Sequence, residues 1–160
     1  MRYVGLDLST KTGVVVLDKD GSILEQKEII NDCDTPESMK NHILETMNEL
    51  QDTDFVVIEG FGYASKTGFL LGGIGWGVRM ALFERNIKFK VIAPTALKKF
   101  ATGSGKADKR KLAVEVNKRW GFFHDSDNVT DAFVLAEVAR SLKEDVKLTA
   151  FQKEVLKKIG

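Results

Sequence analysis

Hydrophobic and polar positions near the amino terminus follow the two-residue period of β-strands. Residues 2–8 and 12–18 are short, mostly apolar and rich in β-branched side chains, and residues 22–30 alternate between apolar and polar. Short polar segments separate these runs and suit tight turns. The pattern predicts an antiparallel meander of three strands, with two further strands over 54–59 and 87–92.

A helical period begins at Thr35, which can cap a helix whose first turn contains Pro36. Its apolar stripe consists of Met39, Ile43, Met47 and Leu50. Further helices are predicted over 67–85, from Pro94, and over 108–119, 128–142 and 149–158. The first of these is rich in glycine, which is unfavourable inside helices, so we expect another backbone, for instance that of a partner subunit, to pack closely there.

The order of these elements predicts an α/β protein. Three consecutive strands, followed by alternating helices and strands, give a mixed five-stranded sheet in which an antiparallel meander adjoins parallel crossover units. Helices are expected on both faces of this sheet. The chain has 160 residues, of which 43% are hydrophobic, as expected for one domain that spans residues 1–160.

Composition excludes several classes of protein. Cys33 is the only cysteine, which rules out an intramolecular disulfide and a cysteine-based zinc finger and suits a reducing compartment. No apolar run approaches the roughly 18 residues of a membrane span. A strand at the very start of the chain argues against a secretory signal. We therefore expect a cytoplasmic protein that does not associate with membranes.

The net charge of +1 says little about partners, but the charges are unevenly distributed. Residues 1–60 contain 5 Lys and Arg against 13 Asp and Glu, whereas residues 98–119 contain 8 against 2. An acidic first third and a basic later segment suggest a carboxylate-lined centre beside a rim that binds phosphate.

Three acids, Asp7, Glu59 and Asp131, lie at the margins of predicted apolar elements. Each acid alone is more simply a turn former or a helix cap. Together, two strand ends and a helix can bring them to one point, and buried charges require a partner or a metal. Asp127 and Asn128 precede Asp131 by four and three residues, on the same helix face. Such oxygen ligands favour Mg²⁺ or Mn²⁺, and two of these ions can support phosphodiester hydrolysis.

The basic segment has a chemistry of its own. Gly103 and Gly105 allow the backbone to approach a phosphate closely. The cationic side chains that can supply counter-charge are Lys98, Lys99, Lys106, Lys109, Arg110 and Lys111. A solvated face is the alternative, but the nearby acids favour phosphate contact. The GSGK sequence lacks the spacing of a Walker A loop, so no nucleotide cofactor is expected.

Four segments, in this order and spacing, resemble the RuvC family of Holliday junction resolvases. They are GLDLSTKTG, VVIEGF, APTALKKFATGSGKADKRKLAVEV and DNVTDAFVLA, which together touch nearly the whole chain. The third is the most specific, because it contains Pro-x-x-x-Lys followed by Gly-x-Gly-x-x-x-Lys. The resemblance implies an RNase H-like fold and a Mg²⁺-dependent endodeoxyribonuclease that cuts four-way DNA as a homodimer, in a bacterium or a phage-infected host cell.

Asp7, Glu59 and Asp131 match three of the family's four metal-binding acids. The fourth position, usually Asp or His, is Asn128 in this chain, with Asp127 beside it. Either residue can therefore complete the site with the second ion.

The resemblance also implies DNA contacts. Lys98 and Lys109 match basic residues that the family uses near the scissile phosphate. Where the family places a wedging aromatic residue after its second acid, this chain has Gly62, flanked by Phe61 and Tyr63, and either of these can substitute.

Three other functions remain open at this stage. The enzyme could cut flaps, forks or branches in general, or the chain could bind junctions with little cleavage because Asn128 weakens its metal site. An actin-like nucleotide-binding domain ranks last, because it needs about twice this length and a second phosphate loop.

Overall fold

The computed structural model describes residues 1–60 and 68–159 of the chain. Its five strands form one sheet in the order β3-β2-β1-β4-β5. The strands are β1 (Tyr3–Asp7), β2 (Lys11–Leu17), β3 (Ile23–Ile30), β4 (Phe55–Glu59) and β5 (Lys88–Ile92). The pairs β1–β2 and β2–β3 are antiparallel, whereas β1–β4 and β4–β5 are parallel. The predicted mixed sheet, a meander beside parallel strands, is thereby confirmed.

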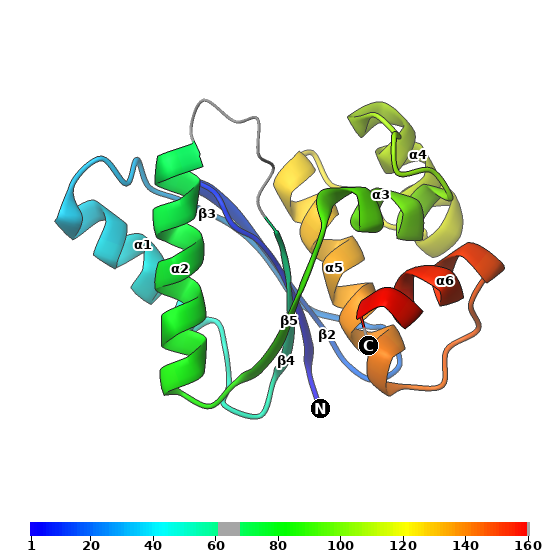
Figure 1. Cartoon of the computed structure of the whole chain (residues 1–160), viewed down its shortest axis with the longest axis horizontal. Helices are drawn as coiled ribbons and strands as arrows, with labels where there is room; N and C mark the ends of the chain where they lie inside the picture. Colours follow the sequence, from blue (N-terminus) through cyan, green and yellow to red (C-terminus); the bar gives the residue numbers. More distant parts are fainter. Residues whose placement is uncertain (61–67, 160) are drawn as a thin grey trace.

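Helices cover both faces of the sheet, as predicted (Figure 1). They are α1 (Pro36–Asn48), α2 (Gly68–Glu84), α3 (Pro94–Thr102), α4 (Lys109–Trp120), α5 (Asp127–Lys143) and α6 (Ala150–Ile159). Helices α1 and α2 lie on one face, and the other four helices lie on the opposite face (Figure 1). The predicted cap of α1 is confirmed, because the Thr35 side chain accepts a hydrogen bond from the Ser38 amide.

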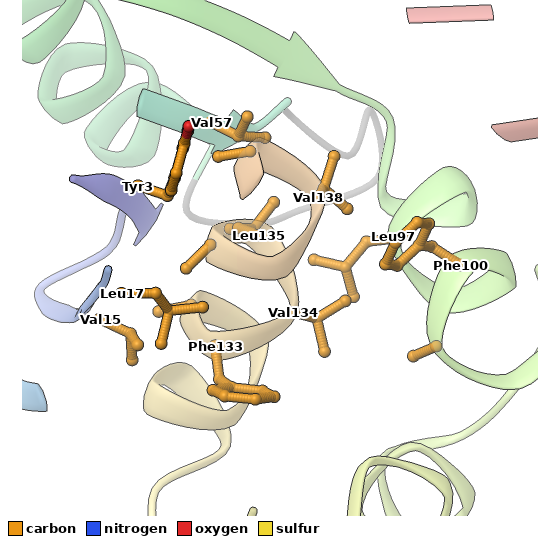
Figure 2. Close-up of a cluster of buried hydrophobic side chains, with 14 of the residues drawn as sticks. Tyr3, Val15, Leu17, Val57, Leu97, Phe100, Phe133, Val134, Leu135 and Val138 are labelled. Atoms are coloured by element: carbon orange, nitrogen blue, oxygen red, sulfur yellow. The ribbon is translucent and has the colours of Figure 1, made fainter. Parts of the chain in front are cut away.

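Because side chains alternate between the two faces of β1 and β4, the hydrophobic core consists of two clusters, one on each face of the sheet. Val4 and Leu6 of β1 belong to a cluster with Val78 and Leu82 of α2. Tyr3, one residue earlier, points the other way, into a larger cluster built around α5. Figure 2 shows this second cluster, in which four strand residues meet side chains of α3 and α5. The labelled members are Tyr3, Val15, Leu17, Val57, Leu97, Phe100, Phe133, Val134, Leu135 and Val138.

Helix α5 lies unusually close to the sheet, and two strand glycines make this possible. A Cβ atom built on Gly5 of β1 would lie 2.5 Å from the Ala136 amide nitrogen and closer still to the Ala132 carbonyl oxygen. On β2, a Cβ atom at Gly13 would overlap the Asn128 backbone at the start of α5. Backbone cannot give way as a flexible side chain can, so the residue type at both positions is fixed by the approach of α5.

Two of the α2 glycines pack against side chains of the same chain, whereas the sequence predicted the backbone of another element. Cβ atoms at Gly73 and Gly77 would meet the side chains of Met39 and Ile43 in α1, so part of the close packing is within the chain. Gly72 meets nothing within 4 Å. Among the described residues, none of the helices combines the length and apolar character that a membrane span needs.

We predict that Gly5→Ala lowers the free energy of unfolding by roughly 3 kcal/mol, because the new methyl group forces α5 away from β1. Gly68→Ala, at the first residue of α2, is the matched control, since its methyl group also enters open space. That variant should be unchanged or more stable by up to about 1 kcal/mol. Chemical denaturation of both variants measures the two values, and equal stabilities would contradict the close approach of α5.

Candidate metal centre

Strand pairing places two carboxylates side by side. Strands β1 and β4 are parallel neighbours, and each ends on an acid, Asp7 and Glu59. Leu6 pairs with Ile58, so the next residue on each strand lies at the same edge of the sheet. Both acids also share the strand face of Gly5, because side chains alternate. That face is the one covered by α5.

Helix α5 supplies the third carboxylate. Because Ala132 lies directly over Gly5, the preceding residue, Asp131, comes to the edge where Asp7 and Glu59 end their strands. Carboxylate oxygens of the three acids all lie within 4.8 Å of one another. The convergence that the sequence predicted for these three residues is therefore present in the structure.

Without a cation, burial disfavours the ionised form of all three acids, and repulsion between carboxylates adds to this effect at Asp7 and Asp131. Burial, followed by the charges of Asp131 and Glu59, raises the pKa of Asp7 well above its ordinary value. Burial and the charge of Glu59 raise the pKa of Asp131 from 3.8 to about 7. Burial also raises the pKa of Glu59. A divalent cation would reverse each of these shifts, because it favours the charged form of every ligand.

The donor set fits a hard cation. Three carboxylates within 4.8 Å offer oxygen atoms alone, the ligands that Mg²⁺ and Mn²⁺ prefer. All three acids are half-buried, and they lie at one edge of the sheet rather than in its middle.

Two lysines face this acidic cluster. The positive charge of Lys109, at the first residue of α4, opposes the burial-driven rise in pKa of Asp7 and Asp131. Lys98 of α3 does the same for the pKa of Glu59. The structure thus brings both predicted lysines to the side of the carboxylates, from two different helices.

The remaining predicted ligands, Asp127 and Asn128, lie at the start of α5. Among the described residues, Asp127 is outside the group of three acids, and its Oδ2 atom lies 3.3 Å from Lys109 Nζ in an exposed ion pair. The Asn128 amide nitrogen lies 3.5 Å from Oε2 of Glu28. The helix cap itself is Ser126, whose side chain accepts from the Val129 amide. Glu28, on β3, was not recognised from the sequence.

The cations of the basic segment lie in two different environments, the exposed start of α4 and the contact between α3 and α6. Lys106, Arg110 and Lys111 are exposed around the start of α4, next to Lys109. Lys99 instead forms an ion pair with Glu154 of α6, with its Nζ atom 3.0 Å from the carboxylate. The exposed rim therefore centres on α4.

The two glycines of this segment also differ. The Gly103 N–H donates to the Lys99 carbonyl, and its left-handed backbone ends α3. Because the helix end occupies this amide, Gly105 is the better candidate for phosphate contact. Phe61 and Tyr63, the predicted wedging aromatics, lie outside the described residues.

No protein-family model matches the chain, and no curated protein matches it in sequence. Similarity is found among solved structures. RuvC of Thermus thermophilus superposes with a TM-score of 0.67 at 22% sequence identity, covering 85% of this chain and 91% of that one. RuvC of T. thermophilus in complex with a Holliday junction substrate gives 0.66 at 19% identity, covering 85% and 90%. The yeast mitochondrial Holliday junction resolvase gives 0.59 at 14%, covering 97% and 80%. The chain therefore has the RuvC-like, RNase H-like fold that its motifs implied.

We predict that Asp131→Asn stabilises the metal-free protein at pH 8 and has little effect at pH 4. The folded chain raises the pKa of this carboxyl from 3.8 to about 7. Its stabilising contribution is thus complete below pH 4 and is lost as the pH rises through 7. Asparagine cannot ionise, so the variant should gain on the order of 2 kcal/mol at pH 8.

Thermal melts in EDTA at a series of pH values measure this difference. Comparing variants at equal pH cancels the opposing effect of His42, whose pKa is lowered by burial. Asp125→Asn, at an exposed neighbouring acid, is the matched control and should leave the melting curve unchanged. Identical melting of Asp131→Asn and the parent protein at pH 8 would show that the ionised Asp131 carboxylate does not destabilise the folded protein.

Proposed function

We propose that this chain is a metal-dependent endonuclease that resolves Holliday junctions by paired, symmetric hydrolysis of phosphodiester bonds. The observation that carries the proposal is the convergence of Asp7, Glu59 and Asp131 within 4.8 Å, beside two lysines. The fold supports it, since the similar solved structures named above include a resolvase with its junction substrate. Branched DNA is accordingly the proposed partner, and Mg²⁺ or Mn²⁺ the proposed cofactor.

Each group of the site has a distinct task in this reaction. Asp7 and Glu59, fixed at the ends of paired strands, would hold the ions, and Asp131 would complete the site and orient the attacking water. Two bound ions would supply Lewis acidity and an activated water. Asn128 and Asp127, in the first turn of α5, would assist through a neutral oxygen and a charge respectively. Lys109 and Lys98 would neutralise the scissile phosphate as negative charge develops on it.

The cationic rim would bind the flanking phosphates. Lys106, Lys109, Arg110 and Lys111 are exposed around the start of α4, and Lys109 among them faces the carboxylates, while Gly105 offers backbone. Such contacts fix the register of the duplex without reading its sequence. Phe61 or Tyr63 is proposed to stack at the point where the strands cross. Selection of branched over linear DNA would then come from shape.

A second copy of the chain is the proposed protein partner, bound through α2. Four large apolar side chains of this helix are between 57% and 99% exposed: Phe69, Trp76, Met80 and Phe83. We call them the α2 stripe. Its members are seven, four and three residues apart, so they repeat at the 3.5-residue period of a helix–helix seam.

Two further features favour a symmetric partner on the α2 stripe. Gly72 lies within this helix and meets nothing in its own chain, so it leaves space for the backbone of another helix. A second copy supplies an identical stripe, and two-fold symmetry gives two active sites for two symmetric cuts. The opposite side of α2 packs in the core through Val78 and Leu82, while Gly73 and Gly77 contact α1, which leaves the α2 stripe free for association.

We predict that Asp7→Asn abolishes Mg²⁺-dependent cleavage of a synthetic four-way junction while junction binding stays intact or tightens. Losing this ligand removes the electrostatic contribution of the metal, worth several kcal/mol, and so lowers the rate by roughly a thousandfold or more. Binding gains because one negative charge facing the phosphates disappears. Asp125→Asn is the control. Cleavage of the junction, a flap and a linear duplex is compared for each protein, and a variant rate within about tenfold of the parent would reject the assigned site.

We predict that Met80→Lys converts the protein to a monomer at micromolar concentration and ends paired cutting of junctions. A lysine in the middle of the α2 stripe would bury a charge in any symmetric seam. Leu44→Lys changes a similarly exposed apolar residue on α1 and should leave the dimer intact. Sedimentation equilibrium reports the mass of each variant. A parent protein that sediments as a monomer yet cuts both strands in one binding event would overturn the proposed dimer.

A further inference from the structure

Glu28 of β3 lies in the same cross-strand row as the metal-binding end of β1. Asp7 pairs with Gly13 of β2, and Gly13 in turn pairs with Glu28. Cross-strand partners share a face, so Glu28 also points to the side covered by α5. Between the two acids, Gly13 carries no side chain, and a Cβ atom there would lie 2.8 Å from the Val129 amide nitrogen. The first turn of α5 therefore sits between Asp7 and Glu28.

Glu28 contacts this first turn at two points. Its Oε2 atom accepts a short hydrogen bond from the Ser126 hydroxyl and lies 3.5 Å from the amide nitrogen of Asn128. Ser126 in turn accepts from the Val129 amide at 3.3 Å and thereby caps the helix. The Glu28 carboxylate thus contacts both Ser126, the cap of α5, and the side chain of Asn128, its second residue.

The chemistry of these contacts determines how the Asn128 amide is turned. A carboxylate accepts hydrogen bonds and donates none, so the group of Asn128 that faces Glu28 must be the NH₂. The carbonyl oxygen is consequently directed away from Glu28 and is left available as an acceptor or ligand. A neutral amide ligates a hard cation only through that oxygen.

We infer that Glu28 is a positioning residue of the metal centre, which fixes the start of α5 and presents the carbonyl oxygen of Asn128, rather than its NH₂, to a divalent cation. This inference rests on the proposed function. It also gives a physical reason for a neutral residue at position 128, because a carboxylate there would face Glu28 without a proton to share. The negative charge is supplied from β3 instead of α5.

A purely structural role would give Glu28 a different signature. If it served only the cap at Ser126, its loss would lower stability and leave metal affinity unchanged. If it orients Asn128, metal affinity should fall, as it commonly does by about tenfold or more when a residue that holds a ligand is replaced.

The test is a Mn²⁺ titration of the intact protein, followed by electron paramagnetic resonance, with melting curves in EDTA and Mg²⁺-dependent junction cleavage in parallel. Glu28→Gln should raise the half-saturating Mn²⁺ concentration about tenfold, because a glutamine can donate to the Asn128 oxygen and turn the amide. Asn128→Ala, which keeps the contact between Glu28 and Ser126, should cause a similar loss. Glu25→Gln, an equal change of charge at an exposed position on the same strand, is the control.

The double variant Glu28→Gln, Asn128→Asp provides a rescue. It moves the negative charge from β3 to α5, and the introduced amide can donate to the introduced carboxylate, so Mn²⁺ affinity should return to within about twofold of the parent. Unchanged Mn²⁺ affinity in Glu28→Gln or in Asn128→Ala, or a double variant no better than Glu28→Gln, would overturn the inference. A parent protein that binds Mn²⁺ but cuts no branched DNA would refute the proposed function, while the titration would still decide the role of Glu28.

Discussion

The backbone of α5 lies almost in contact with the backbone of β1 and β2, and the rest of the site depends on this approach. Only glycine at positions 5 and 13 permits it, because a Cβ atom at either would overlap the helix backbone. The contact at Gly5 sets how far Asp131 stands from the strand ends, and the contact at Gly13 places Asn128 above the sheet. The lack of side chains at Gly5 and Gly13 thus fixes the distance of α5 from the sheet and its register along the strands, and α5 carries the third carboxylate.

Bringing three acids together destabilises the folded state, and their position in the fold limits this destabilisation. Each strand acid is the last residue of its strand, so the apolar residues before it remain buried. Tyr3 and Val57 lie in the cluster that Figure 2 shows, and Leu6 and Ile58 lie in the cluster on the other face of the sheet. Lys98 and Lys109 offset part of the burial-driven rise in the pKa of the acids. The remaining repulsion would favour binding of the proposed metal, because a cation that relieves it in the folded chain also stabilises that state.

The residues that sequence reasoning recovered are those whose position follows from local pattern. Asp7 and Glu59 end apolar strands, and alternation with parallel pairing brings them together without knowledge of the rest of the fold. Glu28 could not be found in this way, since its place depends on the register of β3, which shifts between Val16 and Leu17 of its partner strand. The use of the Gly103 amide within its own helix end likewise follows from backbone geometry, which a glycine-rich sequence does not specify.

The sheet connects the metal centre with the surface proposed for dimerisation. Glu59 ends β4 on the face of α5, whereas Val56 and Ile58 of the same strand face α2. One strand thus carries a proposed metal ligand on one side and supports the helix of the α2 stripe on the other. Protein interiors contain few voids, so a displacement on one side of the sheet is transmitted to the other side rather than absorbed by empty space. In the proposed dimer, the separation of the two active sites would therefore be set by how two α2 helices meet. A shift of that seam would move both carboxylate clusters as rigid units, which is the property that two symmetric cuts on one junction require.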